Sequence, residues 1–267
     1  MAKSQGLLCR EKAFRPAILV TLLSVFLCGS TLASGGTSPT GAVVGEKALY
    51  KLKWGVVGVG EVEIRLDEVS EEAGLVEATL DAKANAFMRR FYDFHTIIKS
   101  RFAPDLEESL GYSRDETASE NLHETIFDWE NGIVRYSKNG DVRNPIPLQP
   151  LCQDPLSIVF AFRSGAVPCS VGTHRVWVTD GKVIDQIEFK VSGPEKLRVP
   201  AGKFSALKIT ADFLGVRAIF ARPEGALIDV WLTDDERMIP IKLKSEAKIG
   251  SFRSELEEYW VDGEQVL

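Results

Sequence analysis

The sequence lacks any apolar stretch long enough to span a bilayer. Its longest apolar run, residues 17–28, is about a dozen residues, whereas a transmembrane helix needs about 20. Four basic residues precede the run: Lys3, Arg10, Lys12 and Arg15. Ala33 follows it among small residues of the kind that signal peptidase recognises. The sequence therefore predicts a secretory signal peptide over residues 1–33 and an exported protein with no transmembrane segment in its mature part.

Cysteine is scarce, and two of the four, Cys9 and Cys28, lie within the predicted signal peptide. Cys152 and Cys169 remain, and we expect them to form a disulfide because exported proteins fold in an oxidising compartment. Two separate buried thiols are the alternative. The absence of a C-x-x-C spacing argues against a catalytic dithiol. Cys28 leaves a lipoprotein anchored at that residue as an alternative, although Leu27 stands where lipoprotein signals favour a small residue.

Histidine is equally scarce, and the usual catalytic motifs are missing. The chain has three histidines, and His123-Glu124 is not followed by the second histidine that a zinc-peptidase motif requires. No G-x-S-x-G elbow occurs, and no glycine-rich loop precedes a helix where it could bind phosphate. The acidic cluster around Asp234 lacks the spacing of a calcium loop. We therefore expect no catalytic residues, no metal site and no cofactor, and interpret the protein as not an enzyme.

Basic residues are also fewer than acidic ones, 32 against 38. The formal net charge is −6, and residues 1–33 carry four basic residues against Glu11 alone, so the remainder is more acidic still. This balance argues against nucleic acid and anionic lipid surfaces as partners, because both favour basic patches. Residues 34–44 resemble a flexible leader, and no comparable linker interrupts residues 45–267. We expect one β-rich domain over residues 45–267.

What the sequence has in abundance is strict alternation of apolar and polar residues. Tyr50, Leu52 and Trp54 alternate with two lysines. The same alternation recurs in later segments: residues 62–66, 76–82, 187–191, 207–213, 239–243 and 252–260. This pattern is typical of half-buried antiparallel strands. Asn-Gly and Asp-Gly pairs between the runs suit tight hairpins, so consecutive strands should be neighbours in the sheet.

One segment breaks the alternation. Asp154 and Pro155 supply a cap acceptor and a first-turn proline for an apolar stretch that ends at Arg163. We expect a short buried helix there, packed at the mouth of the sheet or inside it. Residues 85–92 are a second helical candidate, and they suit a loop that carries Arg89 and Arg90 equally well.

The strand count leads to a binding hypothesis. About ten to twelve strands with one apolar face must curl to bury that face, since one or two short helices cannot cover it. The predicted fold is all-β, a single antiparallel sheet curled into an open or flattened barrel with one or two short helices. Such barrels leave a cavity, which is the default binding site. The candidate ligand-binding residues are alternating aromatic and aliphatic side chains: Trp54, Phe94, Trp129, Trp177, Ile209, Trp231 and Trp260. Any one of the aromatic residues taken alone is better explained as part of the core, because aromatic side chains dominate the buried area of β proteins.

Several short motifs follow one another along the chain. They are Trp54-Gly55 with Gly58 and Gly60, residues 154–157 leading to Arg163, residues 199–204, and residues 230–240. Together they resemble an uncharacterised bacterial envelope family, domain of unknown function 3108, over roughly Gly45 to Trp260. The resemblance implies a secreted, β-rich protein of bacteria with an outer membrane, and it implies no activity. The Pro-Ala-Gly-x-Phe hairpin is also similar to those of periplasmic lipoprotein carriers with half-closed barrels, an analogy of fold alone.

We therefore predict a non-catalytic protein of the periplasm that binds an apolar ligand, such as an acyl chain of a lipid or lipoprotein, in a β-barrel cavity. The alternative is a structural or assembly partner that pairs a sheet edge with another envelope protein. A hydrolase acting on envelope polymers is a third hypothesis, which lacks a nucleophile with its base.

Overall fold

One antiparallel sheet dominates the computed structural model of the chain, which describes residues 42–69, 74–103, 108–212, 227–246 and 250–267. Its strands are β1 (Glu46–Trp54), β2 (Val57–Glu68), β3 (Val76–Ala84), β4 (His95–Phe102), β5 (Ser109–Glu116), β6 (Asn121–Asp128), β7 (Ile133–Lys138), β8 (Asp141–Val142), β9 (Ile146–Pro147), β10 (Gly172–Thr179), β11 (Ile184–Val199), β12 (Gly202–Asp212), β13 (Leu227–Thr233), β14 (Pro240–Glu246), β15 (Ser251–Val261) and β16 (Glu264–Gln265). The predicted signal peptide, residues 1–33, and most of the leader, 34–44, lie outside the described residues.

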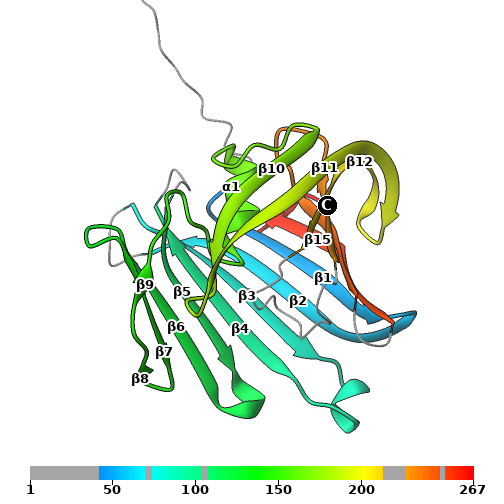
Figure 1. Cartoon of the computed structure of the whole chain (residues 1–267). Helices are drawn as coiled ribbons and strands as arrows, with labels where there is room; N and C mark the ends of the chain where they lie inside the picture. Colours follow the sequence, from blue (N-terminus) through cyan, green and yellow to red (C-terminus); the bar gives the residue numbers. More distant parts are fainter. Residues whose placement is uncertain (1–41, 70–73, 104–107, 213–226, 247–249) are drawn as a thin grey trace, which may run out of the picture. The chain divides into compact units, whose positions relative to one another are not determined.

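The strand order follows the chain almost without interruption. It runs β10-β11-β12-β13-β14-β15-β1-β2-β3-β4-β5-β6-β7-β8, with β16 beside β15 and β9 beside β7. The exception is the pairing of β15 with β1, which places the C-terminal part of the chain beside its first strand (Figure 1). This arrangement confirms the predicted single antiparallel sheet with mostly hairpin connections.

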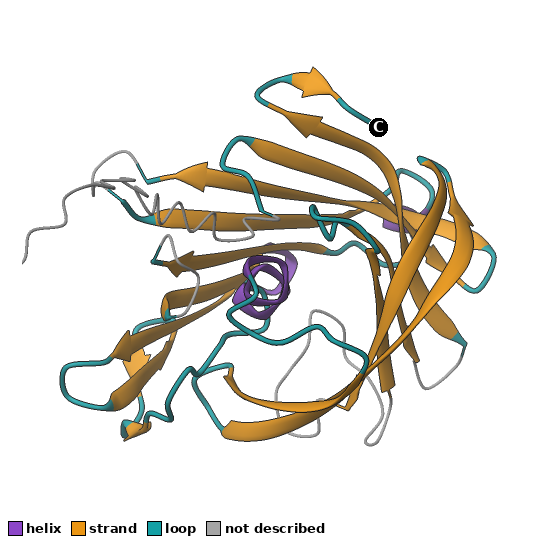
Figure 2. Ribbon diagram, turned by 90° about the horizontal axis from the view of Figure 1, so that it is seen from above, coloured by secondary structure: helices purple, strands orange, loops and turns teal. Residues whose placement is uncertain are grey.

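Alternation gives the sheet one buried face. On β3, Val76, Ala78, Leu80 and Ala82 are buried, and the polar residues between them are more exposed, apart from Thr79. Because side chains alternate across a strand, these residues all point to the same side. The sheet curls so that this side is concave, and the helix α1 (Ser157–Ser164) lies within the curl (Figure 2).

The curled sheet is joined across its opening by a hairpin tip and not by a strand ladder. The Thr125 hydroxyl on β6 donates a hydrogen bond to the carbonyl of Asp180, in the β10–β11 turn, at 3.0 Å. Gly181, in the same turn, has a φ of +89°, and a Cβ there would lie 2.3 Å from Thr125 Oγ1. A larger residue would therefore separate the turn from β6. The barrel is open, as predicted, with its ends held together by side-chain contacts.

Capping and a flanking bridge position α1. The Asp154 carboxylate accepts hydrogen bonds from the backbone N–H groups of Leu156 and Ser157 at 2.8 and 2.9 Å, and the Ser157 hydroxyl accepts one from Asp154 N at 2.8 Å. Asp154 therefore supplies the predicted acceptor, but the helix begins at Ser157 with Leu156 in the cap position, so Pro155 is not its first residue as predicted. Gly165, with a φ of +81°, ends the helix. Just before the cap, Gln153 forms an isolated parallel bridge with Val178 of the edge strand β10.

The other helical candidate is a loop with a single 3₁₀ turn, η1 (Met88–Arg90); a second such turn, η2 (Thr117–Ser119), lies between β5 and β6. The Asn85 side chain caps η1 by accepting a hydrogen bond from Met88 N at 2.8 Å. A longer helix does not form because Phe87 and Phe91 are exposed and Met88 packs only in part against the core, so the segment buries little apolar surface.

Candidate functional site

An apolar cavity of about 130 Å³ lies between α1 and the concave face of the sheet. From the helix, the walls include Pro155, Leu156, Ile158, Val159 and Phe162. From the sheet, they include Ile64, Leu80, Ile187, Phe189, Ile209 and Leu243. The helix therefore forms one wall, and strands from both halves of the sheet form the other.

The cavity wall includes a few polar groups. The Tyr50 hydroxyl donates a hydrogen bond to the carbonyl of Pro240 at 2.8 Å, and burial raises the pKa of this phenol well above its usual value. Lys242, Ser245 and Ser254 complete the polar lining, and no histidine or carboxylate is among the described lining residues. The arrangement is suited to holding an apolar group.

The N-terminal end of α1 is fixed by a fully buried carboxylate. Asp154 Oδ2 accepts hydrogen bonds from the hydroxyls of Ser100 and Ser109 at 2.5 and 2.6 Å, in addition to the helix-capping bonds at Oδ1. Within the described part of the chain Asp154 forms no ion pair. Burial raises the pKa of the Asp154 carboxyl above its usual range, and the hydrogen bonds from the two serines oppose that rise.

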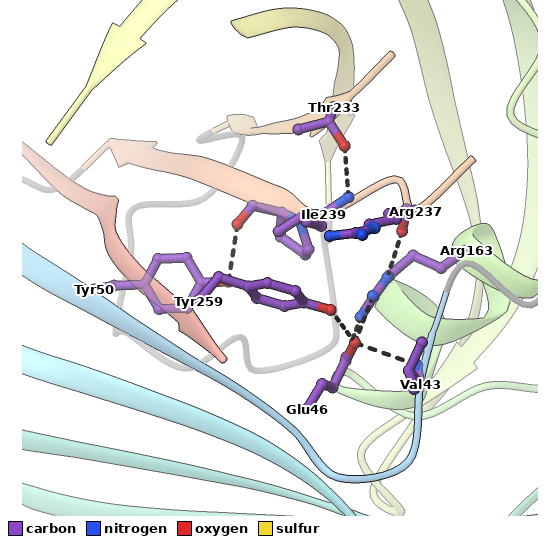
Figure 3. A network of polar contacts seen from close by, with 9 residues as sticks. Val43, Glu46, Tyr50, Arg163, Thr233, Arg237, Ile239 and Tyr259 are labelled. Atoms are coloured by element: carbon purple, nitrogen blue, oxygen red, sulfur yellow. Dashed lines mark hydrogen bonds and ion pairs between the residues drawn. The ribbon is translucent and has the colours of Figure 1, made fainter. Parts of the chain in front are cut away.

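The C-terminal end of α1 is fixed by a buried ion pair (Figure 3). Arg163 makes a bidentate contact with Glu46 of β1, with Nη2 donating to Oε2 at 2.7 Å and Nη1 donating to Oε1. Tyr259 of β15 donates its hydroxyl proton to the same carboxylate at 2.6 Å. Arg163 Nε donates to the carbonyl of Arg237 at 3.1 Å. Burial lowers the pKa of Arg163, but the Glu46 carboxylate more than compensates, so the guanidinium stays charged.

A separate buried polar group lies on β5, β6 and β7. His123 Nδ1 is 2.6 Å from the Tyr136 hydroxyl, and burial, together with the charges of Lys182 and Arg114, lowers the pKa of His123 to about 4. Arg114 is paired with Glu116 at 2.6 Å. His123 is therefore neutral at physiological pH. In the described ranges, no three His, Cys, Asp or Glu side chains lie close enough together to hold a metal ion.

The predicted disulfide between Cys152 and Cys169 is absent, and both residues are free thiols. Cys152 belongs to the larger core cluster, whereas Cys169 packs against a second cluster beside α1. Burial raises the pKa of Cys152 to about 12 and that of Cys169 to about 11, so neither thiol is a ready nucleophile. The prediction rested on compartment and residue count, and neither says whether two Cβ atoms approach within about 4.5 Å of each other.

Of the predicted ligand-binding residues, Ile209 lines the cavity. The six aromatic residues of that set lie outside its lining. Trp129 is partly buried and donates to the carbonyl of Ser109 at 2.8 Å, and Trp177 and Phe94 pack against the larger core cluster. Trp54 is exposed at the end of β1.

The remaining two tryptophans lie beside lysine side chains. The Trp231 ring is 5.2 Å from Lys208 Nζ and 5.0 Å from Lys242 Nζ, and its indole N–H donates to Glu195. Lys47 Nζ lies 4.7 Å from the ring centroid of Trp260. These cation–π contacts occupy faces of the rings that an apolar ligand would need.

Three aromatic residues of the lining were not among the predicted site residues: Tyr50, Phe162 and Phe189. Phe162 and Phe189 meet edge to face with ring centroids 4.8 Å apart. Their signals were present in the sequence, because Phe162 lies in the predicted helix and Phe189 on a predicted strand. What was missing was the contact between the two elements.

Comparison with protein families gives one match. The model of the family described as proteins of unknown function, DUF3108, matches residues 49–257. No curated protein matches the chain. In the described residues, no helix is long and apolar enough to cross a membrane.

Several solved structures match the chain, and the fold of the first one described here is similar. A β-barrel-like protein of the DUF1849 family from Brucella abortus is 13% identical, covers 82% of this chain and 98% of its own, and has a TM-score of 0.54. A protein from Bacteroides fragilis, described as exported and YmcC-like in fold, is 10% identical over 82% of this chain and 96% of its own, with a TM-score of 0.32. A protein from Parabacteroides distasonis, described as a lipoprotein, is 11% identical over 82% and 96% of the two chains, with a TM-score of 0.28.

Proposed function

The chain belongs to the DUF3108 family, and on that premise we propose that it is a non-catalytic envelope protein that binds an apolar ligand in the cavity beside α1. The observation that carries the proposal is the lining itself, which is aliphatic and aromatic on both the helix and the sheet sides. Apolar cavities remain dry and take up apolar molecules, because water finds no hydrogen-bond partners there. The ligand class is an acyl chain of a lipid or lipoprotein.

The size of the cavity limits what it holds. A volume of about 130 Å³ is close to the roughly 150 Å³ that admits a single benzene-sized molecule in other proteins. It is smaller than the ~300 Å³ lower limit of typical ligand pockets. A short alkyl segment therefore fits as the walls stand, and a full acyl chain requires α1 or a strand to move outward.

The non-enzymatic part of the proposal rests on how the nearby polar groups are used. Tyr50 bonds to a backbone carbonyl, Asp154 caps the helix and Arg163 is paired with Glu46. Each of these groups has a structural hydrogen-bond partner, and none is presented to the cavity as an acid or base beside a nucleophile. We also propose that the protein acts in the periplasm, as the predicted signal peptide implies, with an outer-membrane lipoprotein anchored at Cys28 as the alternative.

The test uses an environment-sensitive apolar dye and a fatty acid, titrated into the native protein. Ile209→Ala enlarges the cavity wall and should change affinity severalfold, whereas Ala211→Leu fills the cavity and should abolish uptake. The matched control is Ile98→Ala, which truncates a buried residue of the same face outside the cavity lining. It should lower the free energy of unfolding by about 2–5 kcal/mol without changing affinity.

Two outcomes would count against the proposal. Native protein that takes up no dye or fatty acid would remove the cavity as a binding site. If Ile209→Ala, Ala211→Leu and Ile98→Ala all change the affinity for the dye equally, the dye binds outside the cavity. Native mass spectrometry of the exported protein distinguishes the alternatives, since a co-purifying lipid supports ligand binding and a protein partner alone favours the assembly role.

A further inference from the structure

Exposed apolar side chains gather at one end of the sheet, on two neighbouring connections. Six of them, which we call the aromatic rim, lie in the β1–β2 and β3–β4 connections or at the strand ends that flank the first: Trp54, Val56, Val57, Phe87, Phe91 and Tyr92. Val56 is 89% exposed and Phe91 is 74% exposed, so these side chains project into solvent. Contiguous exposed apolar side chains mark interaction surfaces more often than isolated ones do.

Two hydrogen bonds from Asn85 join the β3–β4 connection to the start of β2. Asn85 N donates to the carbonyl of Val59 at 3.0 Å, and Asn85 Nδ2 donates to the carbonyl of Gly58 at 2.8 Å. Both connections lie at the lower right of the sheet in Figure 1. Phe87 and Phe91 contact each other with ring centroids 5.4 Å apart. These contacts fix the positions of the rim side chains relative to one another.

The rim also has a local charge opposite to that of the chain. Arg89 and Arg90 are exposed in η1, and neither forms an ion pair in the part of the chain that the structure describes. Asp93 is the acidic residue of the same connection, and Glu61 of the adjacent β2 is paired with Lys83 at 3.0 Å. Arginine beside exposed aromatic rings is the combination that suits a membrane–water interface, since the rings enter the headgroup region and the guanidinium contacts phosphate.

We propose that the aromatic rim docks the protein on the surface of a phospholipid bilayer. This inference rests on the proposed function, and the position of the cavity relative to the rim supports a lipid surface as the partner. Val62 lines the cavity on β2, and Val57 of the rim lies on the same strand, roughly 16 Å away at about 3.3 Å per residue. If the rim docks on a bilayer, the strands that line the cavity point one of their ends toward the lipid.

The acidic charge of the whole chain sets the character of this binding. A net charge of −6 opposes long-range attraction to anionic lipid, so apolar insertion of the rim must supply most of the affinity. The two arginines add short-range contacts to phosphate that salt weakens. Binding to vesicles should therefore weaken at high salt but not disappear, whereas binding through a purely basic surface would be lost.

The test is co-sedimentation of the exported protein with vesicles of phosphatidylethanolamine and phosphatidylglycerol, and with vesicles of phosphatidylcholine alone. Phe87→Ser/Phe91→Ser should weaken binding to both by about tenfold or more, because two inserted rings are lost. Arg89→Gln/Arg90→Gln should weaken binding severalfold on the phosphatidylglycerol vesicles. The matched control is Val142→Ser/Val171→Ser, which removes two side chains that are 76% and 66% exposed elsewhere and should change nothing.

Failure of this inference is distinguishable from failure of the proposed function. The Phe87→Ser/Phe91→Ser protein should still take up the apolar dye in its cavity, because neither ring lines it. Native protein that does not sediment with either vesicle overturns the docking proposal, and so does equal loss in the valine control. A protein partner that binds native protein but not the phenylalanine variant, in the absence of vesicle binding, would also overturn it.

Discussion

At its N-terminal end, α1 is anchored by Asp154, buried among hydroxyl and amide donors; at its C-terminal end it is anchored by Arg163, buried against the Glu46 carboxylate. Both ends thus place a charged residue type inside an apolar barrel. Burial disfavours the charged form of both residues. Only Arg163 has a partner of opposite charge, Glu46, which favours its charged form again.

The difference separates two ways of positioning a helix. The bidentate pair joins α1 to β1, and Tyr259 of β15 supports it. The carboxylate at the other end joins α1 to β4 and β5 through Ser100 and Ser109. Apolar contacts alone would allow the helix to slide or rotate along the concave face, whereas these directional bonds specify one position. The helical wall of the cavity depends on both anchors.

Breaking the ion pair should have the largest effect. Arg163→Met leaves Glu46 as a buried charge without its partner, which should lower the free energy of unfolding by about 3–5 kcal/mol in urea denaturation. The matched control is Arg175→Met, which removes one partner of an exposed pair with Glu188 and should cost less than about 1 kcal/mol.

A double variant sharpens that result. Glu46→Leu/Arg163→Met removes both charges, so it should recover much of the stability that Arg163→Met loses. If Arg163→Met costs no more than the exposed control, the pair does not act as a buried anchor.

Removing the other anchor should have an intermediate effect. Asp154→Ala deletes the cap and leaves the hydroxyls of Ser100 and Ser109 without their acceptor, which should cost about 2 kcal/mol. Asp235→Ala is the matched control, since this exposed carboxylate accepts comparable bonds from Arg237 N, Met238 N and the Thr233 hydroxyl. Its cost should be about 1 kcal/mol or less. Equal costs in the two variants would show that burial adds nothing to the cap.

The smallest effect concerns pH. The pKa of Asp154 is higher in the folded protein than in the unfolded chain, so its favourable contribution is complete at low pH and is lost as pH rises through the folded pKa. The stability of the native protein relative to Asp154→Asn should therefore increase as pH falls from about 7 toward 4. Urea unfolding of both proteins across that range checks the sign, and parallel curves would contradict it.

Much of the fold was predictable because its signals are local. Alternation within residues 76–82 predicts which side chains share a face, and this depends only on the geometry of a strand. The cap at Asp154 was predictable for the same reason, since the acceptor and its donors lie within four residues. The sequence pattern of residues 85–92 suits both a loop and a helix. The segment forms a loop because it buries little of its surface against the sheet.

The site was less predictable. The alternation of tryptophans with polar neighbours predicts inward-facing binding residues, but alternation does not say which of the two faces α1 covers or how far along a strand the cavity extends. Trp231 is next to Leu232 on β13, so it lies on the face opposite to that of Ile228 and Leu232. Those two residues line the cavity, whereas Trp231 packs beside two lysines. The cysteine pairing was wrong in the structure for a related reason, because a disulfide depends on the distance between two Cβ atoms.

By itself, the sequence determined an all-β sheet with one buried face and one capped helix, since both follow from spacing along the chain. Its ordered motifs also resemble those of the family to which the chain belongs. The tertiary structure alone decided that β1 pairs with β15, that Glu46 meets Arg163 across 117 positions, and that Phe162 and Phe189 share a cavity. Those contacts arise from how a curled sheet folds back on a helix, and no local pattern records the distance between residues so far apart in the chain.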